Sequence, residues 1–169
     1  FMVTPPAKIE LGMQMEQVMR IFDETNAWNL PVVDKGKYIG FVDSDDCIHP
    51  EMYQRLYDDI CIHKVKLAFC HPNMCKGEIK TPLLSQPTIC HPKDYVLLRS
   101  MVENIWWSAW TKLYHRSLFN DIRYPYGKTN EDYAITMFIY DQCDQIAINY
   151  NKLYNYCIRE NSISTSPLN

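Results

Sequence analysis

The sequence predicts an α/β domain in which a mixed sheet is flanked by helices. Residues 38–42 are aromatic, β-branched or small, which is typical of a buried strand. Residues 15–22 and 52–60 instead place apolar side chains at helical spacing. With 169 residues, of which 47% are hydrophobic, the chain is long enough to bury a sizeable core.

Composition narrows the classes of partner. The net charge is −3, and the lysines and arginines are scattered, so we expect no nucleic-acid partner. No apolar stretch approaches the roughly 18 to 20 residues that a membrane span needs. Seven cysteines at irregular spacings favour reduced thiols and a cytoplasmic protein, and peripheral attachment at the inner membrane face stays open.

The N-terminal part predicts a short hairpin. Residues 1–12 should be extended, and a helix over 15–22 should follow. Residues 30–34 predict a strand, and Lys35-Gly36 predicts a tight turn into the strand at Tyr38. We therefore expect these two strands to pair antiparallel.

The remaining elements follow from periodicity and from proline positions. A helix should begin at Pro50, with Met52, Leu56 and Ile60 on its buried face. The other expected elements, in chain order, are a strand at 65–70, a loop or short hairpin at 71–88, a helix from about Pro92 to 102, a strand and short helix over 110–119, an extended segment at 122–127, a helix at 133–140, and two closing strands around 149–151.

Three carboxylates follow the strand at 38–42 directly: Asp43, Asp45 and Asp46. In open α/β sheets, ligands bind beyond the carboxyl ends of the strands. Mg²⁺ and Mn²⁺ prefer carboxylate oxygens and are often shared with a phosphate-bearing substrate. This run is therefore a candidate metal and diphosphate site. The alternative is an acidic turn that caps the following helix.

A second acidic pair, Glu131-Asp132, enters the helix predicted at 133–140. Carboxylates suit the positive N-terminal end of a helix dipole, so helix capping is one interpretation of this pair. A catalytic role is the other.

Residues of about 8–42 resemble the latter half of a CBS domain, a regulatory module often bound to adenosine nucleotides. The resemblance rests on 19–22, 29–34 and 36–42. It implies an alternative function as an adenosine-nucleotide-binding regulatory module.

Residues of about 36–166 resemble a family 2 glycosyltransferase of the GT-A fold. Four signatures carry the resemblance in order: the strand ending in Asp43-Ser44-Asp45-Asp46, the segment 110–116, the pair Glu131-Asp132, and the stretch 154–163. The resemblance implies a partial GT-A fold and an inverting, metal-dependent hexosyltransferase that moves sugar from a nucleotide-diphosphate donor to a saccharide or lipid-linked acceptor.

The resemblance also implies roles for individual residues. Asp43 and Asp45 would hold the ribose and a Mn²⁺ or Mg²⁺ ion on the diphosphate, with Asp46 sharing these tasks. Asp132 would be the general base, and Glu131 an orienting neighbour. Lys112 and Arg159 would contact the diphosphate or the acceptor. Trp106, Trp107 and Trp110 would either stack on sugars or pack in the core.

Structural zinc is a further alternative. Thiols and imidazoles occur within about thirty residues of one another, but without a Cys-x2-Cys pair. The set comprises Cys61, His63, Cys70, His71, Cys75, Cys90 and His91.

The two resemblances predict a composite chain. Residues 1–36 would be CBS-like and 37–169 glycosyltransferase-like, in one merged globular unit that lacks the usual N-terminal nucleotide-binding part. A truncated or chimeric domain of this kind would turn over weakly or not at all. The strand at Tyr38 would be parallel to its neighbours in a transferase core but antiparallel in the predicted hairpin.

Overall fold

The structure is a computed structural model. It describes residues 7–10, 13, 15–25, 29–34, 36–74, 86–102, 107–122 and 131–157. The elements in chain order are β1 (Ile9–Glu10), α1 (Met15–Thr25), β2 (Asn29–Asp34), β3 (Tyr38–Asp43), β4 (Cys47–Ile48), α2 (Met52–His63), β5 (Leu67–Asn73), β6 (Thr88–Cys90), α3 (Pro92–Val102), the 3-10 helix η1 (Ala109–Thr111), β7 (Lys112–His115), the 3-10 helix η2 (Arg116–Phe119), α4 (Glu131–Asp141) and β8 (Ile146–Asn155).

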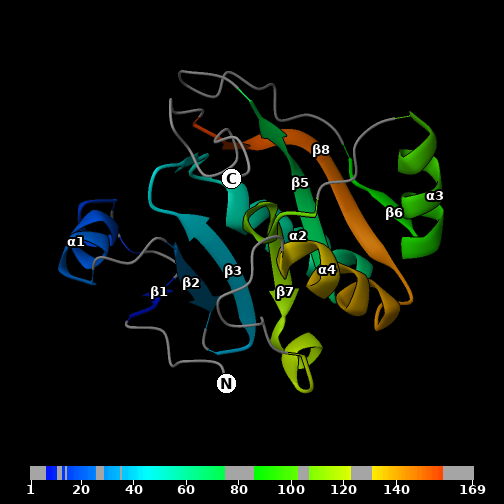
Figure 1. Cartoon of the computed structure of the whole chain (residues 1–169), viewed down its shortest axis with the longest axis horizontal. Coiled ribbons are helices and arrows are strands. Elements are labelled where there is room, and N and C mark those ends of the chain that lie inside the picture. Colours follow the sequence, from blue (N-terminus) through cyan, green and yellow to red (C-terminus); the bar gives the residue numbers. More distant parts are fainter. Residues whose placement is uncertain are drawn as a thin grey trace, which may run out of the picture.

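The strands of the described residues form one mixed sheet. Its order is β1-β2-β3-β7-β5-β8-β4. β6 lies off this path and pairs with β8. The pairs β1/β2 and β5/β8 are parallel, whereas the other pairs are antiparallel. The predicted α/β class with a mixed sheet is confirmed (Figure 1).

The predicted hairpin is present. β2 and β3 pair antiparallel with Asp34 opposite Tyr38, and Gly36 lies between them with a φ of +69°. Glycine adopts this left-handed conformation without the steric cost of a Cβ. β3 is also antiparallel to β7, so the parallel arrangement expected from a transferase core is wrong for this strand.

Helices cover both faces of the sheet. α2 lies on one face, and α3 and α4 lie on the other (Figure 1). Residues along β5 alternate between the two cores: Ala68 and Cys70 pack with α2, whereas Leu67 and Phe69 pack with α3 and α4. Because successive strand residues point to opposite faces, one apolar strand supplies both layers.

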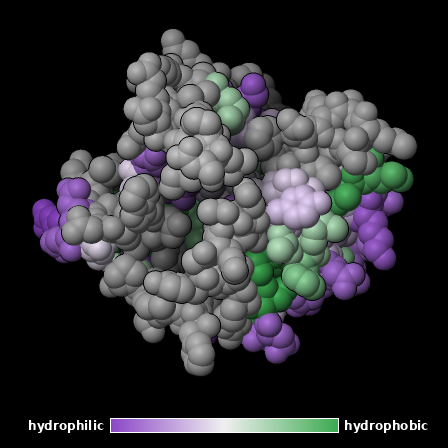
Figure 2. Space-filling view, in the orientation of Figure 1, coloured by the Kyte–Doolittle hydropathy of each residue, from purple (hydrophilic) through white to green (hydrophobic). Residues whose placement is uncertain are grey.

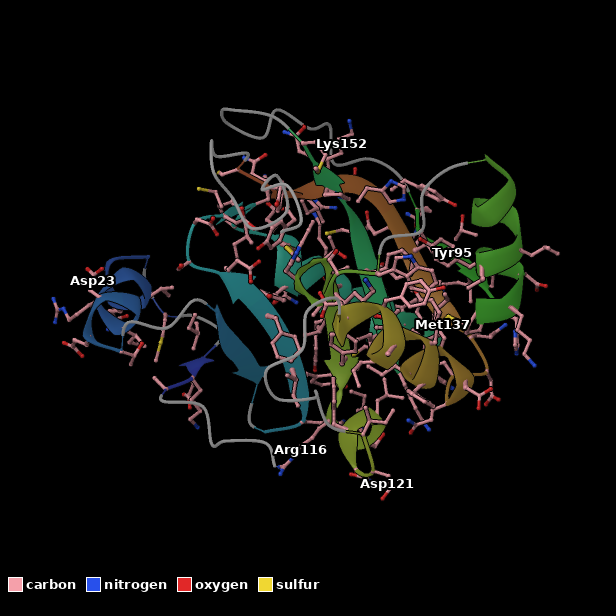
Figure 3. All side chains as sticks on the ribbon, in the orientation of Figure 1. Asp23, Tyr95, Arg116, Asp121, Met137 and Lys152 are labelled. Atoms are coloured by element: carbon pink, nitrogen blue, oxygen red, sulfur yellow. The ribbon has the colours of Figure 1, made fainter. Side chains whose placement is uncertain are left out.

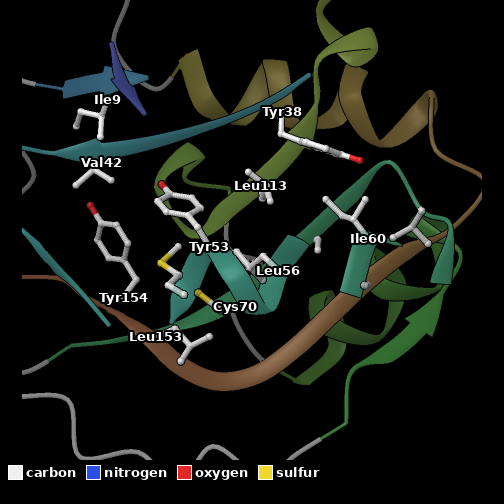
Figure 4. Close-up of a cluster of buried hydrophobic side chains, with 14 residues drawn as sticks. Ile9, Tyr38, Val42, Tyr53, Leu56, Ile60, Cys70, Leu113, Leu153 and Tyr154 are labelled. Atoms are coloured by element: carbon white, nitrogen blue, oxygen red, sulfur yellow. The ribbon is translucent and has the colours of Figure 1, made fainter. Parts of the chain in front are cut away.

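The core beneath α2 reaches the end of the sheet where β3 stops. Leu56 of α2 is fully buried among Cys70, Leu113 and Tyr154, which come from three different strands (Figure 4). The tightest contact lies at Gly40, because a Cβ there would meet the ring of Tyr53. The hydroxyl of Tyr53 donates to the carbonyl of Phe41 at 3.0 Å, which ties α2 to β3.

Several sequence predictions need correction. The two closing strands are one ten-residue strand, β8, whose pairing with β5 is irregular next to Asn149. α2 begins at Met52, so Pro50 precedes the helix instead of opening it. The segment predicted as a loop or short hairpin at 71–88 contains the end of β5, which continues to Asn73, and the first residue of β6, which pairs with β8.

The sheet runs without interruption from the CBS-like segment into the rest of the chain, because β3 pairs with β2 on one side and β7 on the other. No helix among the described residues is long and apolar enough to cross a bilayer. Of the cysteines that the structure describes, all six have free thiols.

Candidate functional site

The acidic run forms a cluster at the end of β3. Asp43 is the last residue of the strand, and the amide of Asp46 donates to the carbonyl of Asp43 at 3.2 Å, which closes a tight turn. One carboxylate oxygen from each of Asp43, Asp45 and Asp46 lies within 4.8 Å of the others. All three side chains are half-buried. Three converging carboxylate oxygens fit a hard divalent cation such as Mn²⁺ or Mg²⁺.

The end of β8 fixes this turn. The hydroxyl of Tyr154 accepts from the amide of Asp43 at 3.2 Å and donates to Oδ2 of Asp46 at 2.8 Å. The amide of Cys157 donates to Oδ1 of Asp46, also at 2.8 Å. Burial, followed by the charge of Asp43, raises the pKa of Tyr154 far above its ordinary value, so its hydroxyl stays protonated. Asp46 therefore anchors the turn through both of its carboxylate oxygens.

Asp132 contacts the first residue of η1. It is the second residue of α4, and its Oδ2 accepts a hydrogen bond of 3.2 Å from the amide of Ala109. Thr136, one turn further along α4, donates to the carbonyl of Trp107 at 2.7 Å. These two bonds fix the start of α4 against the segment that leads into η1.

Trp110 of η1 connects the two acidic sites. Its ring stacks on Tyr154 with centroids 4.3 Å apart and on Tyr156 at 5.5 Å. Tyr154 bonds Asp46, whereas Ala109, the residue before Trp110, bonds Asp132. η1 is therefore bonded directly to Asp132 and is linked to the aspartate cluster through the ring of Tyr154.

Lys112 is fully buried at the start of β7. Its Nζ donates to the carbonyl of Ser108 at 2.5 Å and to Oγ1 of Thr111 at 3.4 Å. Burial lowers the pKa of Lys112 to about 7, while the charge of Asp132 acts in the opposite direction. Both of these hydrogen bonds from Nζ go to the turn around η1, and the contact of Lys112 with the diphosphate or the acceptor stays a prediction.

The remaining predicted site residues either pack away from the aspartate cluster or lie outside the described part of the chain. Trp107 packs against Tyr133 with ring centroids 4.5 Å apart. Arg159, Trp106 and the side chain of Glu131 lie outside the described part of the chain. Among the described residues, the only group suited to a metal ion is the aspartate cluster, and no cysteine–histidine set converges.

Sequence reasoning missed how Tyr154, Trp110 and the Ala109 amide support the site. Tyr154 and Trp110 belong to the aromatic stretches that carry the transferase resemblance, but their partners lie far away in the chain. The aromatic run at 153–156 was the available signal, because tyrosines in a core usually find a hydrogen-bond partner for the hydroxyl, but it did not identify Asp46 as that partner.

A surface groove lies elsewhere, between α3 and α4. Val96, Leu97, Met137 and Tyr140 line it, and Met137 and the nearby Tyr95 are labelled in Figure 3. Exposed apolar side chains gather on this face (Figure 2). His91 of the alternative zinc set lines this groove, whereas the aspartate cluster, Lys112 and Asp132 do not.

Comparisons with known proteins identify relatives of both segments. A family model described as the CBS domain matches residues 1–50. Glycosyltransferase GlyA of Streptococcus pneumoniae is 30% identical in an alignment of 142 residues that covers 76% of this chain and 20% of GlyA. The uncharacterized glycosyltransferase YibD of Escherichia coli is 27% identical, over 78% of this chain and 41% of YibD. The chain thus spans less than half the length of these relatives.

Among solved structures, S. aureus TarS 1-349 in complex with UDP-GlcNAc superposes with a TM-score of 0.63. The match has 21% identity and covers 93% of this chain and 50% of the TarS chain. The fold is therefore similar to that of a glycosyltransferase of the GT-A type. The resemblances to glycosyltransferases and to a CBS domain are both confirmed.

Proposed function

We propose that this chain carries the metal-binding and acceptor-activating part of a family 2 glycosyltransferase, an inverting hexosyltransferase that uses a nucleotide-diphosphate sugar. The observation that carries the proposal is the shared contact with η1: Tyr154 ties the aspartate cluster to Trp110, and Asp132 bonds Ala109. Sequence similarity to GlyA and YibD and the TarS-like fold support it.

Asp45 and Asp43 would hold the cation, because their carboxylates converge while Asp46 is bonded to the end of β8. A bound Mn²⁺ or Mg²⁺ would offset the negative charge on the leaving diphosphate. The related TarS structure holds UDP-GlcNAc, which supports a nucleotide-sugar donor here.

Asp132 would act on the acceptor, a saccharide or a lipid-linked hydroxyl. Its carboxylate takes the hydroxyl proton while the oxygen forms a bond to the anomeric carbon. The bond from that carbon to the diphosphate breaks, and its electron pair leaves with the diphosphate. Attack from the face opposite the leaving group inverts the anomeric centre. Glu131 and Arg159 are proposed as neighbours that orient the reactants.

We further propose that turnover is slow. Residues 1–50 match a CBS domain, and β2 pairs antiparallel with β3 next to the aspartate cluster. Contacts to the base and ribose of the donor would then be incomplete, and a poorly positioned donor reacts slowly.

The test combines Mn²⁺ calorimetry with transfer and hydrolysis assays over a panel of nucleotide sugars. Asp45→Asn should weaken Mn²⁺ binding at least about tenfold, because a ligand charge is lost. Asp132→Asn should leave Mn²⁺ binding unchanged and lower transfer by about 10² to 10⁴-fold. The control is Asp121→Asn, at an exposed position beside η2. Unchanged Mn²⁺ affinity in Asp45→Asn would refute the metal assignment.

The CBS match favours a second candidate function, a regulatory module that binds adenosine nucleotides. Calorimetry with AMP and ATP in the absence of metal tests it. Tight binding that survives Asp45→Asn would support the regulatory module. Binding that requires Mn²⁺ and Asp45 would support the sugar-nucleotide site.

A further inference from the structure

Lys112 is the one described lysine whose side chain is fully buried. A buried ammonium loses its hydration, so its position requires compensating contacts. Three groups supply them: the carbonyl of Ser108 just before η1, the hydroxyl of Thr111 in η1, and the face of the Phe69 ring in β5, whose centroid is 5.4 Å from Nζ.

Lys112 and Asp132 bind opposite ends of one peptide unit. The carbonyl of Ser108 and the amide of Ala109 belong to the same planar peptide. Lys112 binds the oxygen of this unit, and Asp132 binds its N–H. Fixing the carbonyl therefore fixes the direction in which the amide donates to Asp132. The hydroxyl of Tyr114 and the amide of Lys112 hold the next carbonyl, that of Ala109.

Lys112 and Asp132 also interact through their charges. Desolvation lowers the pKa of Lys112 to about 7, and the charges of Asp132 and Cys70 are the opposing influences. Burial raises the pKa of the Cys70 thiol to about 12, so Cys70 is neutral near pH 7. Asp132 is therefore the group that supplies negative charge to Lys112 at that pH.

We propose that Lys112 is a positioning residue for Asp132: its ammonium fixes the Ser108–Ala109 peptide that binds the carboxylate, and its charge keeps that carboxylate ionised and able to accept a proton. The role of Asp132 as the base rests on the proposed function. The physical coupling of the two side chains does not depend on it.

Coupling of this kind is reciprocal, and this gives a test that needs no turnover. Carbon-13 NMR of the full chain would follow the titration of the Asp132 carboxyl and, separately, of the Lys112 Cε. In Lys112→Met, the titration midpoint of Asp132 should rise by about one pH unit or more. In Asp132→Asn, the midpoint of Lys112 should fall by a similar amount.

Matched controls separate coupling from general perturbation. Lys93→Met removes an exposed lysine on α3 and should leave the Asp132 midpoint in place. Asp121→Asn should leave the Lys112 midpoint in place. If Lys112→Met does not fold, the Asp132→Asn measurement still decides the matter, because the asparagine oxygen can still accept from Ala109. The proposal is wrong if, in the variants that fold, neither the Asp132 midpoint in Lys112→Met nor the Lys112 midpoint in Asp132→Asn moves.

Activity provides a second readout that a purely structural role would not change. In Lys112→Met, the acidic limb of the kcat/KM profile should move to higher pH together with the NMR midpoint. If the wild type transfers sugar and the limb stays in place, the positioning role is overturned while the proposed function survives. If no transfer occurs but the midpoints shift reciprocally, the coupling is supported and the proposed function fails.

Discussion

The hydroxyl of Tyr154 donates to the carboxylate of Asp46 at 2.8 Å across 108 positions of sequence. The same oxygen accepts from the amide of Asp43. The phenol group of Tyr154 thus bonds both ends of the acidic turn after β3 to the end of β8, and the amide of Cys157 adds a second bond to Asp46. The geometry of the proposed metal site depends on the phenol group although it would not itself be a ligand.

Tyr154→Phe should weaken Mn²⁺ binding by about tenfold, because groups that orient metal ligands typically have effects of this size. The substitution also removes a buried hydrogen bond to a charged group, which should lower the free energy of unfolding by about 2 kcal/mol. Calorimetry and urea denaturation measure the two effects. The control is Tyr150→Phe, since Tyr150 lies on the same strand and is 47% exposed. Equal Mn²⁺ affinity in both variants would contradict the anchoring role.

Mn²⁺ should broaden a specific set of amide signals. The ion would sit at the aspartate cluster, and paramagnetic broadening falls steeply with distance. The amide of Cys157 should broaden early, because it bonds Asp46 although it is distant in sequence. Leu97 on α3 should remain sharp. Two-dimensional NMR during a Mn²⁺ titration checks this. Broadening that begins at α3 would place the ion elsewhere.

Local periodicity was sufficient to predict most helices and the inner strands. The α2 helix shows why: Met52, Leu56 and Ile60 are spaced four apart, and all three are buried. The strand at 38–42 was equally visible, because its residues suit a buried sheet. The acidic cluster was visible because its members are adjacent in sequence, so a single turn brings them together.

Long-range contacts explain where prediction failed. Asn149 and Asn151 are typical turn residues, yet both are buried within β8. Asn149 donates to Asp59 at 3.0 Å and accepts from the amide and the side chain of Asn151. Asp59 is ninety positions away, so a local pattern could not reveal that these polar groups would be satisfied inside a sheet.

Lys112 illustrates the same limit within the candidate site. Lysine is among the residues least often buried, so nothing in the sequence indicated that Lys112 would lie in the core. Its actual partners are carbonyl and hydroxyl oxygens of a 3-10 turn whose position depends on β5 and α4. The sequence shows that Lys112 can donate hydrogen bonds, but only the tertiary structure shows that the acceptors are the Ser108 carbonyl and the Thr111 hydroxyl.

Gly40→Ala should destabilise the fold by about 1 to 3 kcal/mol through overpacking. A Cβ at this position would lie 2.7 Å from the hydroxyl oxygen of Tyr53 and still closer to its ring. Urea denaturation measures the loss. In a Tyr53→Leu background the same alanine should cost much less, because the obstructing phenol is gone. Identical losses in both backgrounds would show that the close approach is not the cause.

Stability should fall as the pH rises through the titration of Asp59. Burial is the main influence that raises the pKa of Asp59 above its ordinary value of 3.8, and it outweighs the bond from Asn149. The charges of His63 and Arg55 lower this pKa, and that of Asp58 raises it. The folded protein therefore binds this proton more tightly than the unfolded chain. The resulting stabilisation is complete below 3.8 and is lost as the pH passes the raised pKa.

Asp59→Asn should remove this dependence, because the amide oxygen can still accept from Asn149 but carries no charge. Urea denaturation at a series of pH values should show the variant gaining stability relative to the wild type as the pH increases. Asp121→Asn, at an exposed position beside η2, should follow the wild-type curve. If the Asp59→Asn curve runs parallel to the wild-type curve at every pH, Asp59 does not keep its proton longer in the folded state, and the raised pKa is refuted.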